Sequence, residues 1–68
     1  MAGTIDHAIK TVAFQGDISL DKAARLVAYL VKHGDMTIDV VNGSWKVKHG
    51  ALLDKPTVRL MSKNLERD

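Results

Sequence analysis

The stretch that decides the fold runs from Met36 to His49 and reads MTIDVV, then NG, then SWKVKH. The Asn42-Gly43 pair between two β-prone runs predicts a β-hairpin with a two-residue type I′ turn, because both central residues of that turn need a positive φ. The turn would place Met36 opposite His49 at the open end of the hairpin. The rest of the chain is expected to cover one face of this ribbon.

The predicted register gives the hairpin one apolar face and one polar face, since neighbouring side chains in a strand point to opposite sides. Asp39 and Lys46 would face each other across the strands as an ion pair. A two-stranded ribbon is barely stable alone, so its apolar face must pack on the flanking segments, and Trp45 is expected in that core. The apolar face would carry Ile38, Val40, Trp45 and Val47, and the polar face Thr37, Asp39, Lys46 and Lys48.

Residues 20–33 carry the clearest helical pattern in the chain. Ser19 is placed to cap the helix, Ile18 to form a hydrophobic staple, and Gly34 to end the helix in a left-handed conformation. At about 100° per residue, the segment has one broad apolar face and one polar face. The apolar face comprises Leu20, Ala23, Ala24, Leu26, Val27, Leu30 and Val31. The polar face comprises Asp21, Lys22, Arg25, Tyr29, Lys32 and His33.

The N-terminal segment is ambiguous between helix and strand, and helix is favoured. Residues 4–15 fit a helix that Thr4 caps, with Gly16 just beyond its end. Residues 11–14 also alternate as a strand would. Phe14 is expected in the core.

The C-terminal segment is also ambiguous between helix and strand. Asp54 can cap a helix over residues 56–66, and Pro56 is tolerated in a first helical turn because its missing N–H would be unpaired there. The alternative is a third strand over residues 57–62 that returns to the hairpin. As a helix, which is favoured, the segment would turn Val58, Met61 and Leu65 inward and Arg59, Lys63 and Arg67 outward.

Length and composition indicate one small globular domain. The 68 residues form a single domain, residues 1–68, which is marginal in size for a stable monomer. Hydrophobic residues make up 46% and charged residues 26%, which argues against disorder. No cysteine, secretory signal or membrane-spanning stretch is visible, so we expect a cytoplasmic protein. The sequence predicts an α+β fold with helices packed on one face of the central hairpin.

Basic side chains are concentrated towards the C-terminus. Residues 1–43 carry four basic and five acidic side chains, whereas residues 44–68 carry six basic and three acidic ones. Lys and Arg neutralise phosphates, and an exposed Tyr can stack on a base or hydrogen-bond a phosphate oxygen. The candidate binding residues are therefore Lys22, Arg25, Tyr29 and Lys32 on the helix, Lys46 and Lys48 on the hairpin, and Arg59 and Lys63 in the last segment.

A helix followed by a basic ribbon resembles, in element order, the recognition helix and wing of winged-helix DNA-binding domains. The resemblance implies that the polar face of residues 20–33 would contact a duplex while Lys46 and Lys48 contact phosphate. Those domains normally present a helix-turn-helix before the wing, whereas here one ambiguous segment precedes the helix. A solvated amphipathic helix, whose Lys and Arg stems cover apolar surface, explains the same pattern without a ligand.

The function expected from these features is non-enzymatic. The chain contains no P-loop, dinucleotide-binding, nucleophile-elbow or zinc-protease motif, and no cofactor is implied. His33, Asp35 and His49 are too poor a ligand set to predict a metal site. The leading hypothesis is a small nucleic-acid-binding regulator. The alternative is an inhibitor or adaptor that docks Tyr29 and the basic residues on an acidic protein surface, and a homodimer would bury apolar area that so small a monomer leaves uncovered.

Overall fold

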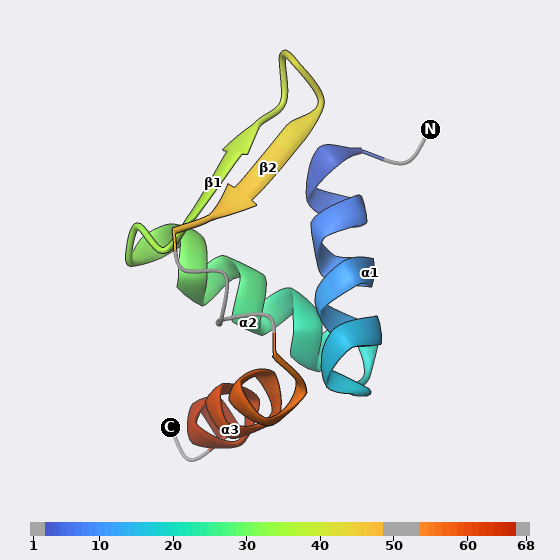
Figure 1. Cartoon of the computed structure of the whole chain (residues 1–68), viewed down its shortest axis with the longest axis vertical. Coiled ribbons are helices and arrows are strands. Elements are labelled where there is room, and N and C mark those ends of the chain that lie inside the picture. Colours follow the sequence, from blue (N-terminus) through green and yellow to red (C-terminus); the bar gives the residue numbers. More distant parts are fainter. Residues whose placement is uncertain (1–2, 49–53, 67–68) are drawn as a thin grey trace.

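Three helices pack against a two-stranded antiparallel sheet (Figure 1). The structure is a computed structural model and describes residues 3–48 and 54–66. The predicted α+β class is confirmed, and both ambiguous segments are helices. Along the chain the elements are α1 (Thr4–Gly16), α2 (Leu20–Lys32), β1 (Met36–Asp39), β2 (Ser44–Val47) and α3 (Lys55–Glu66).

Helix α2 lies at the centre of the arrangement. In Figure 1 the hairpin lies on one side of α2 and α3 lies on the other, while α1 packs against α2, α3 and both strands. The apolar face predicted for α2 is the face that packs inward, although Leu20 and Val31 at its edges are 56% and 43% exposed. The core that results is formed by Ala8, Val12, Ala23, Leu26, Val27, Leu30, Met36 and Val58.

Helix α1 buries small residues, and this overturns one prediction. Its buried positions are Ala8, Val12 and Gly16, which follow one another at intervals of four residues. Phe14 was expected in the core, but its side chain is 83% exposed. The reason is angular: Phe14 lies two residues from Val12, about 200° around the helix axis, and so points away from the core. The N-cap is Gly3, not Thr4.

The turn between α1 and α2 has three residues and is held by local hydrogen bonds. Asp17 adopts the left-handed conformation (φ 53°), and the Ile18 N–H donates to the Ala13 carbonyl at 3.1 Å. The predicted cap is confirmed, because Ser19 Oγ accepts from the Lys22 N–H at 3.2 Å. Gly16 is the last residue of α1, so this helix ends one residue later than predicted. At the far end of α2, Gly34 has the expected positive φ of 78°.

The hairpin forms where predicted, but its register differs by two residues. The pairs are Met36 with Val47, Thr37 with Lys46, Ile38 with Trp45, and Asp39 with Ser44. The two-residue turn is therefore wrong, and four residues, 40–43, connect the strands. A shift of two preserves the alternation, so the apolar and polar faces survive. His49, the expected partner of Met36, lies outside the described residues.

The carboxylate of Asp39 explains the longer loop. Its Oδ1 accepts from the N–H groups of Val41 and Asn42, both at 3.1 Å, and its Oδ2 accepts from Asn42 Nδ2 at 2.7 Å. An Asp side chain that caps a turn in this way is a common local alternative to strand pairing. Asp39 lies opposite Ser44, so the ion pair predicted with Lys46 is wrong. Val40, expected on the apolar face, is 66% exposed in the loop.

Trp45 joins the hairpin to α1. Its ring is partly buried against the core, as expected, and its Nε1 donates to Nδ1 of His7 at 2.8 Å. This hydrogen bond requires that His7 Nδ1 carry no proton. The apolar face of the ribbon is thus tied to α1 by packing and by one polar contact.

Helix α3 crosses the end of α1 through a close contact. Val58 is fully buried, Met61 and Leu65 are partly buried as predicted, and Gly16 of α1 lies directly against Val58. A methyl group built at Gly16 would overlap Cγ1 of Val58 and lie 3.0 Å from its Cβ. Only a glycine permits this approach of the two helices.

We expect acid to weaken the hairpin loop through Asp39. Hydrogen bonds from the backbone and side chain of Asn42, together with that from the Val41 N–H, outweigh desolvation and hold the pKa of Asp39 below its ordinary value of 3.8. Because the folded-state pKa is lowered, this stabilisation is present above pH 3.8 and is lost as the pH falls below it. Thermal melts of the wild type and Asp39→Asn should therefore differ at neutral pH and converge in acid. A difference in Tm that does not change with pH would contradict this.

The Gly16–Val58 contact can be tested with a double-mutant cycle. Gly16→Ala should destabilise the domain by about 1–3 kcal/mol through overpacking, despite the better helix propensity of alanine. Val58→Ala removes the methyl group that the added Cβ would overlap, so the double variant should be more stable than the two single changes predict together, by about 0.5–3 kcal/mol. Urea denaturation measures all four proteins. Strict additivity would show that the two residues do not meet.

Candidate functional site

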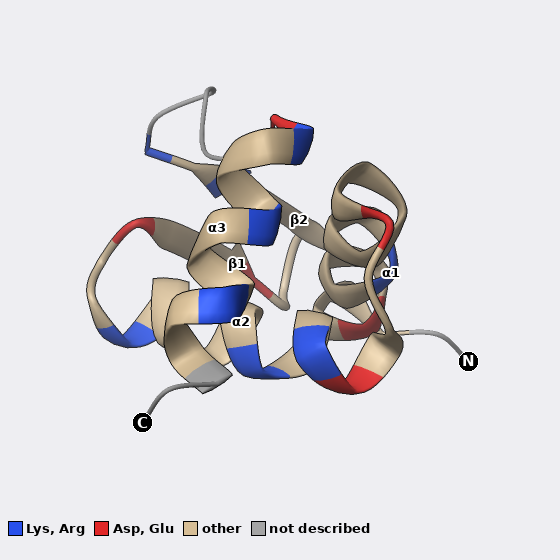
Figure 2. Cartoon of the chain, turned by 90° about the horizontal axis from the view of Figure 1, so that it is seen from below, with Lys and Arg blue, Asp and Glu red and all other residues tan. Residues whose placement is uncertain are grey.

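Three predicted cationic residues meet in one hollow. Lys22 in the first turn of α2 and Arg59 and Lys63 on α3 line an open hollow of about 380 Å³, together with Ile18, Leu60 and Ser62. We call it the cationic hollow. Figure 2 shows the Lys and Arg positions along α3 beside those of α2. Two helices that are far apart in sequence thus contribute charge of one sign to a single concave surface.

Arg59 is held in place by the end of α1. Its Nη1 donates to the carbonyl oxygens of Gly16 and Asp17, each at 3.3 Å. The C-terminal carbonyls of a helix carry partial negative charge, so a cation is favoured there. A guanidinium has five N–H donors, and those not directed at α1 remain for an anion in the hollow. Arg59 therefore contacts the end of α1 and also lines the cationic hollow.

Tyr29 lies further along the same seam between α2 and α3. It lines a smaller hollow of about 230 Å³ with Met61, Asn64, Leu65 and Asp35. The Tyr29 residue is 38% exposed, and the His33 ring packs beside its ring at a centroid distance of 4.2 Å and a tilt of 40°. We call this the tyrosine hollow, and the two hollows together the α2–α3 seam.

Arg25 and Lys32 do not line either hollow. Both are exposed, as predicted for the polar face of α2. Lys32 borders an apolar groove on the opposite flank of α2, formed with α1 and β1 and lined by Ile9, Val27 and Ile38 among others. The four candidate binding residues of α2 therefore share its polar face, but only Lys22 and Tyr29 line the seam.

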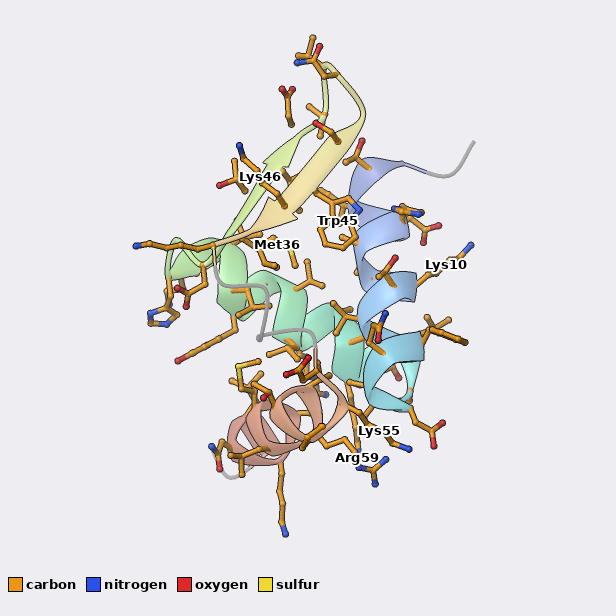
Figure 3. The ribbon with its side chains drawn as sticks, viewed as in Figure 1. Lys10, Met36, Trp45, Lys46, Lys55 and Arg59 are labelled. Atoms are coloured by element: carbon orange, nitrogen blue, oxygen red, sulfur yellow. The ribbon has the colours of Figure 1, made fainter. Side chains whose placement is uncertain are left out.

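The hairpin lysines lie away from the cationic hollow. Lys46 is exposed on the polar face of the ribbon, where it borders a depression with Thr37 and Asp39. In Figure 3, Lys46 and Arg59 are on opposite sides of α2. Lys48 is exposed at the end of the ribbon, and its N–H donates to the Asp35 carbonyl at 2.8 Å. The expected surface combined the polar face of α2 with the hairpin lysines, whereas the hollow that Lys22 lines is shared with Arg59 and Lys63 of α3.

Sequence reasoning missed Lys55. It opens α3, is exposed, and lies beside Arg59 in Figure 3. The spacing of Lys55, Arg59 and Lys63 at four-residue intervals was a usable signal, because such residues share one helix face. The predicted row began one turn later and ended at Arg67, which lies outside the described residues. No local pattern could show that Lys22 meets this row, because that contact depends on how the helices pack.

The described residues contain neither a cluster of metal ligands nor a membrane-spanning helix. Within 3–48 and 54–66, no three His, Asp or Glu side chains come together as a metal site would require. In the same part of the chain, no helix has the length and apolar character needed to cross a membrane. Comparison with protein-family models, curated proteins and solved structures finds no match for this chain.

Comparing Arg59→Ala with Lys63→Ala should show how much the hydrogen bonds of Arg59 to α1 stabilise the fold, because both substitutions remove one positive charge from α3. Arg59→Ala removes two charge-assisted hydrogen bonds to the end of α1 and should lower the free energy of unfolding by roughly 1 kcal/mol. Lys63→Ala, one turn further along the exposed face, should change it by less than about 0.5 kcal/mol. Urea denaturation measures both. Equal effects of the two substitutions would show that the bonds to Gly16 and Asp17 stabilise nothing.

Proposed function

We propose that this domain is a non-enzymatic regulatory protein that binds nucleic acid through the α2–α3 seam. The observation that carries the proposal is the convergence of Lys22, Arg59 and Lys63 on one hollow. Cations from two elements around a concave surface suit a phosphate, whose negative charge they neutralise together. Lys55 and Arg25, exposed on α3 and α2, extend the positive surface on both sides. The proposal implies a cytoplasmic protein, because nucleic acid is found there.

The resemblance to winged-helix domains supports only part of this proposal. Two helices joined by three residues precede the hairpin, which is closer to a helix-turn-helix than the sequence suggested. The third helix, however, follows the hairpin and packs beside α2. The proposed surface is therefore the seam with α3, in place of the α2 and hairpin combination that the resemblance implies.

An acidic protein surface is the second candidate partner. Leu60 is 60% exposed at the edge of the cationic hollow, and Leu20 is 56% exposed in the first turn of α2. Apolar side chains among cations favour a protein partner, since interfaces combine buried apolar contacts with a charged rim. Such a partner would hold the protein by the same residues.

The test measures binding of the purified protein to fluorescent DNA and RNA across a salt series, with fluorescence anisotropy as the readout. We expect a Kd that rises steeply with salt, with a slope that reports the number of phosphates contacted. Lys63→Ala and Lys22→Ala should each weaken binding several-fold and reduce the slope by about 0.7–0.9, because each removes one phosphate contact.

Lys46→Ala is the matched control, because it removes one exposed lysine on the other side of α2. It should leave the affinity unchanged, and thermal melts should show that all three variants are folded. Absence of binding at low salt would overturn the proposal and favour the acidic protein partner. Equal weakening by Lys46→Ala and Lys63→Ala would remove the seam as the binding surface.

A further inference from the structure

We infer that the α2–α3 seam selects single-stranded over double-stranded nucleic acid, with a phosphate in the cationic hollow and an unpaired base against Tyr29. This inference rests on the proposed function and specifies its ligand. It starts from the chemical difference between the two hollows. One is lined by Lys22, Arg59 and Lys63, and the other by Tyr29 and Asn64 with apolar side chains of α3.

The tyrosine hollow suits a base better than a phosphate. Met61 and Leu65 supply apolar surface, Asn64 supplies an amide that both donates and accepts hydrogen bonds, and Asp35 adds an acidic residue. The negative charge of a carboxylate opposes a phosphate at the same place. The partly apolar and hydrogen-bonding lining of this hollow matches the face and edge of a nucleobase.

Tyr29 is partly exposed and has one ring neighbour among the described residues. His33 packs against it at a centroid distance of 4.2 Å, which restricts the ring, and 38% of the residue remains exposed. Stacking of a base on an aromatic side chain is a common feature of single-strand binding and tolerates any sequence. In a duplex the faces of each base are covered by its neighbours, so only an unpaired base can stack on Tyr29.

The spacing of the two hollows fits a short length of one strand. Lys22 and Tyr29 are seven residues apart on α2, which corresponds to about 10 Å at 1.5 Å per residue. A strand that advances about 3.4 Å per nucleotide when stacked, and more when extended, would cover that distance in two or three nucleotides. A phosphate and a base that are two or three nucleotides apart on one strand can therefore occupy the two hollows together.

The packing of α3 against α2 argues against a duplex at the seam. The major groove of B-DNA is about 12 Å wide and admits one α-helix. Each helix is about 10–12 Å across with its side chains, so α2 and α3 side by side are too wide to enter that groove with the seam facing the bases. A single strand can follow the seam without this restriction.

The test compares four oligonucleotides of about 12 nucleotides: single-stranded DNA, single-stranded RNA, the DNA duplex, and an abasic DNA strand that keeps every phosphate. The wild type should bind single strands about tenfold more tightly than the duplex. Tyr29→Leu should weaken binding to strands with bases by about 5- to 100-fold, the equivalent of losing one stacked base, and should not change binding to the abasic strand. Tyr29→Phe, which keeps the ring, should bind as the wild type does.

The outcomes separate this inference from the proposed function. The inference is overturned if the wild type binds the duplex as tightly as the single strands, or if Tyr29→Leu binds single strands normally. If Lys63→Ala still weakens binding in either case, the seam is a general phosphate-binding surface. If the wild type binds none of the four oligonucleotides, the proposed function itself fails. If Tyr29→Leu weakens binding to the abasic strand as much as binding to strands with bases, the loss comes from a damaged fold. If Tyr29→Phe, which keeps the ring, is impaired as well, stacking on the ring is contradicted.

Discussion

The close approach of Gly16 to Val58 is the constraint on which the rest of the structure depends. It brings the start of α3 onto the end of α1 and closes the core over the first turn of α2. Among the described residues the core is small and consists largely of Ala, Val and Leu. The position of α3 relative to α1 is therefore set by the contact of the Gly16 backbone with the branched side chain of Val58. This contact tolerates little adjustment because protein interiors are close-packed.

The candidate site is a consequence of that contact. Val58 is followed directly by Arg59, so seating Val58 against Gly16 brings the Arg59 guanidinium to the Gly16 and Asp17 carbonyls. One turn further along, Lys63 lies on the same face of α3. The three-residue turn after Gly16 then starts α2 close by, and Lys22 enters the hollow from the opposite side. Packing of an apolar pair thus holds three cations close together despite their mutual repulsion.

The features that could be predicted from the sequence are those that depend on interactions between neighbouring residues. The cap at Ser19, the left-handed Gly34 and the apolar face of α2 were all predictable, since each depends on neighbouring residues. The hairpin was predictable, but its register was not, because the Asp39 carboxylate competes for the loop amides with the turn that Asn42-Gly43 favours. Phe14 was misplaced because α1 buries Ala8, Val12 and Gly16, a stripe too small to be recognised as a core face. The meeting of Lys22 with Arg59 had no local signal, since the two residues are 37 positions apart in the sequence.

The position of α3 also changes what kind of surface α2 presents. Without α3, the polar face of α2 would be convex, and Lys22, Arg25, Tyr29 and Lys32 would project as they do from a helix that enters a DNA groove. With α3 packed alongside, Lys22 and Tyr29 become walls of two hollows, while Arg25 and Lys32 stay outside them. A convex cationic helix fits a groove in its ligand, whereas a concave cationic seam fits a chain that can lie within it. Under the proposed function, the same residues would therefore bind a different ligand once the helix that follows the hairpin is in place.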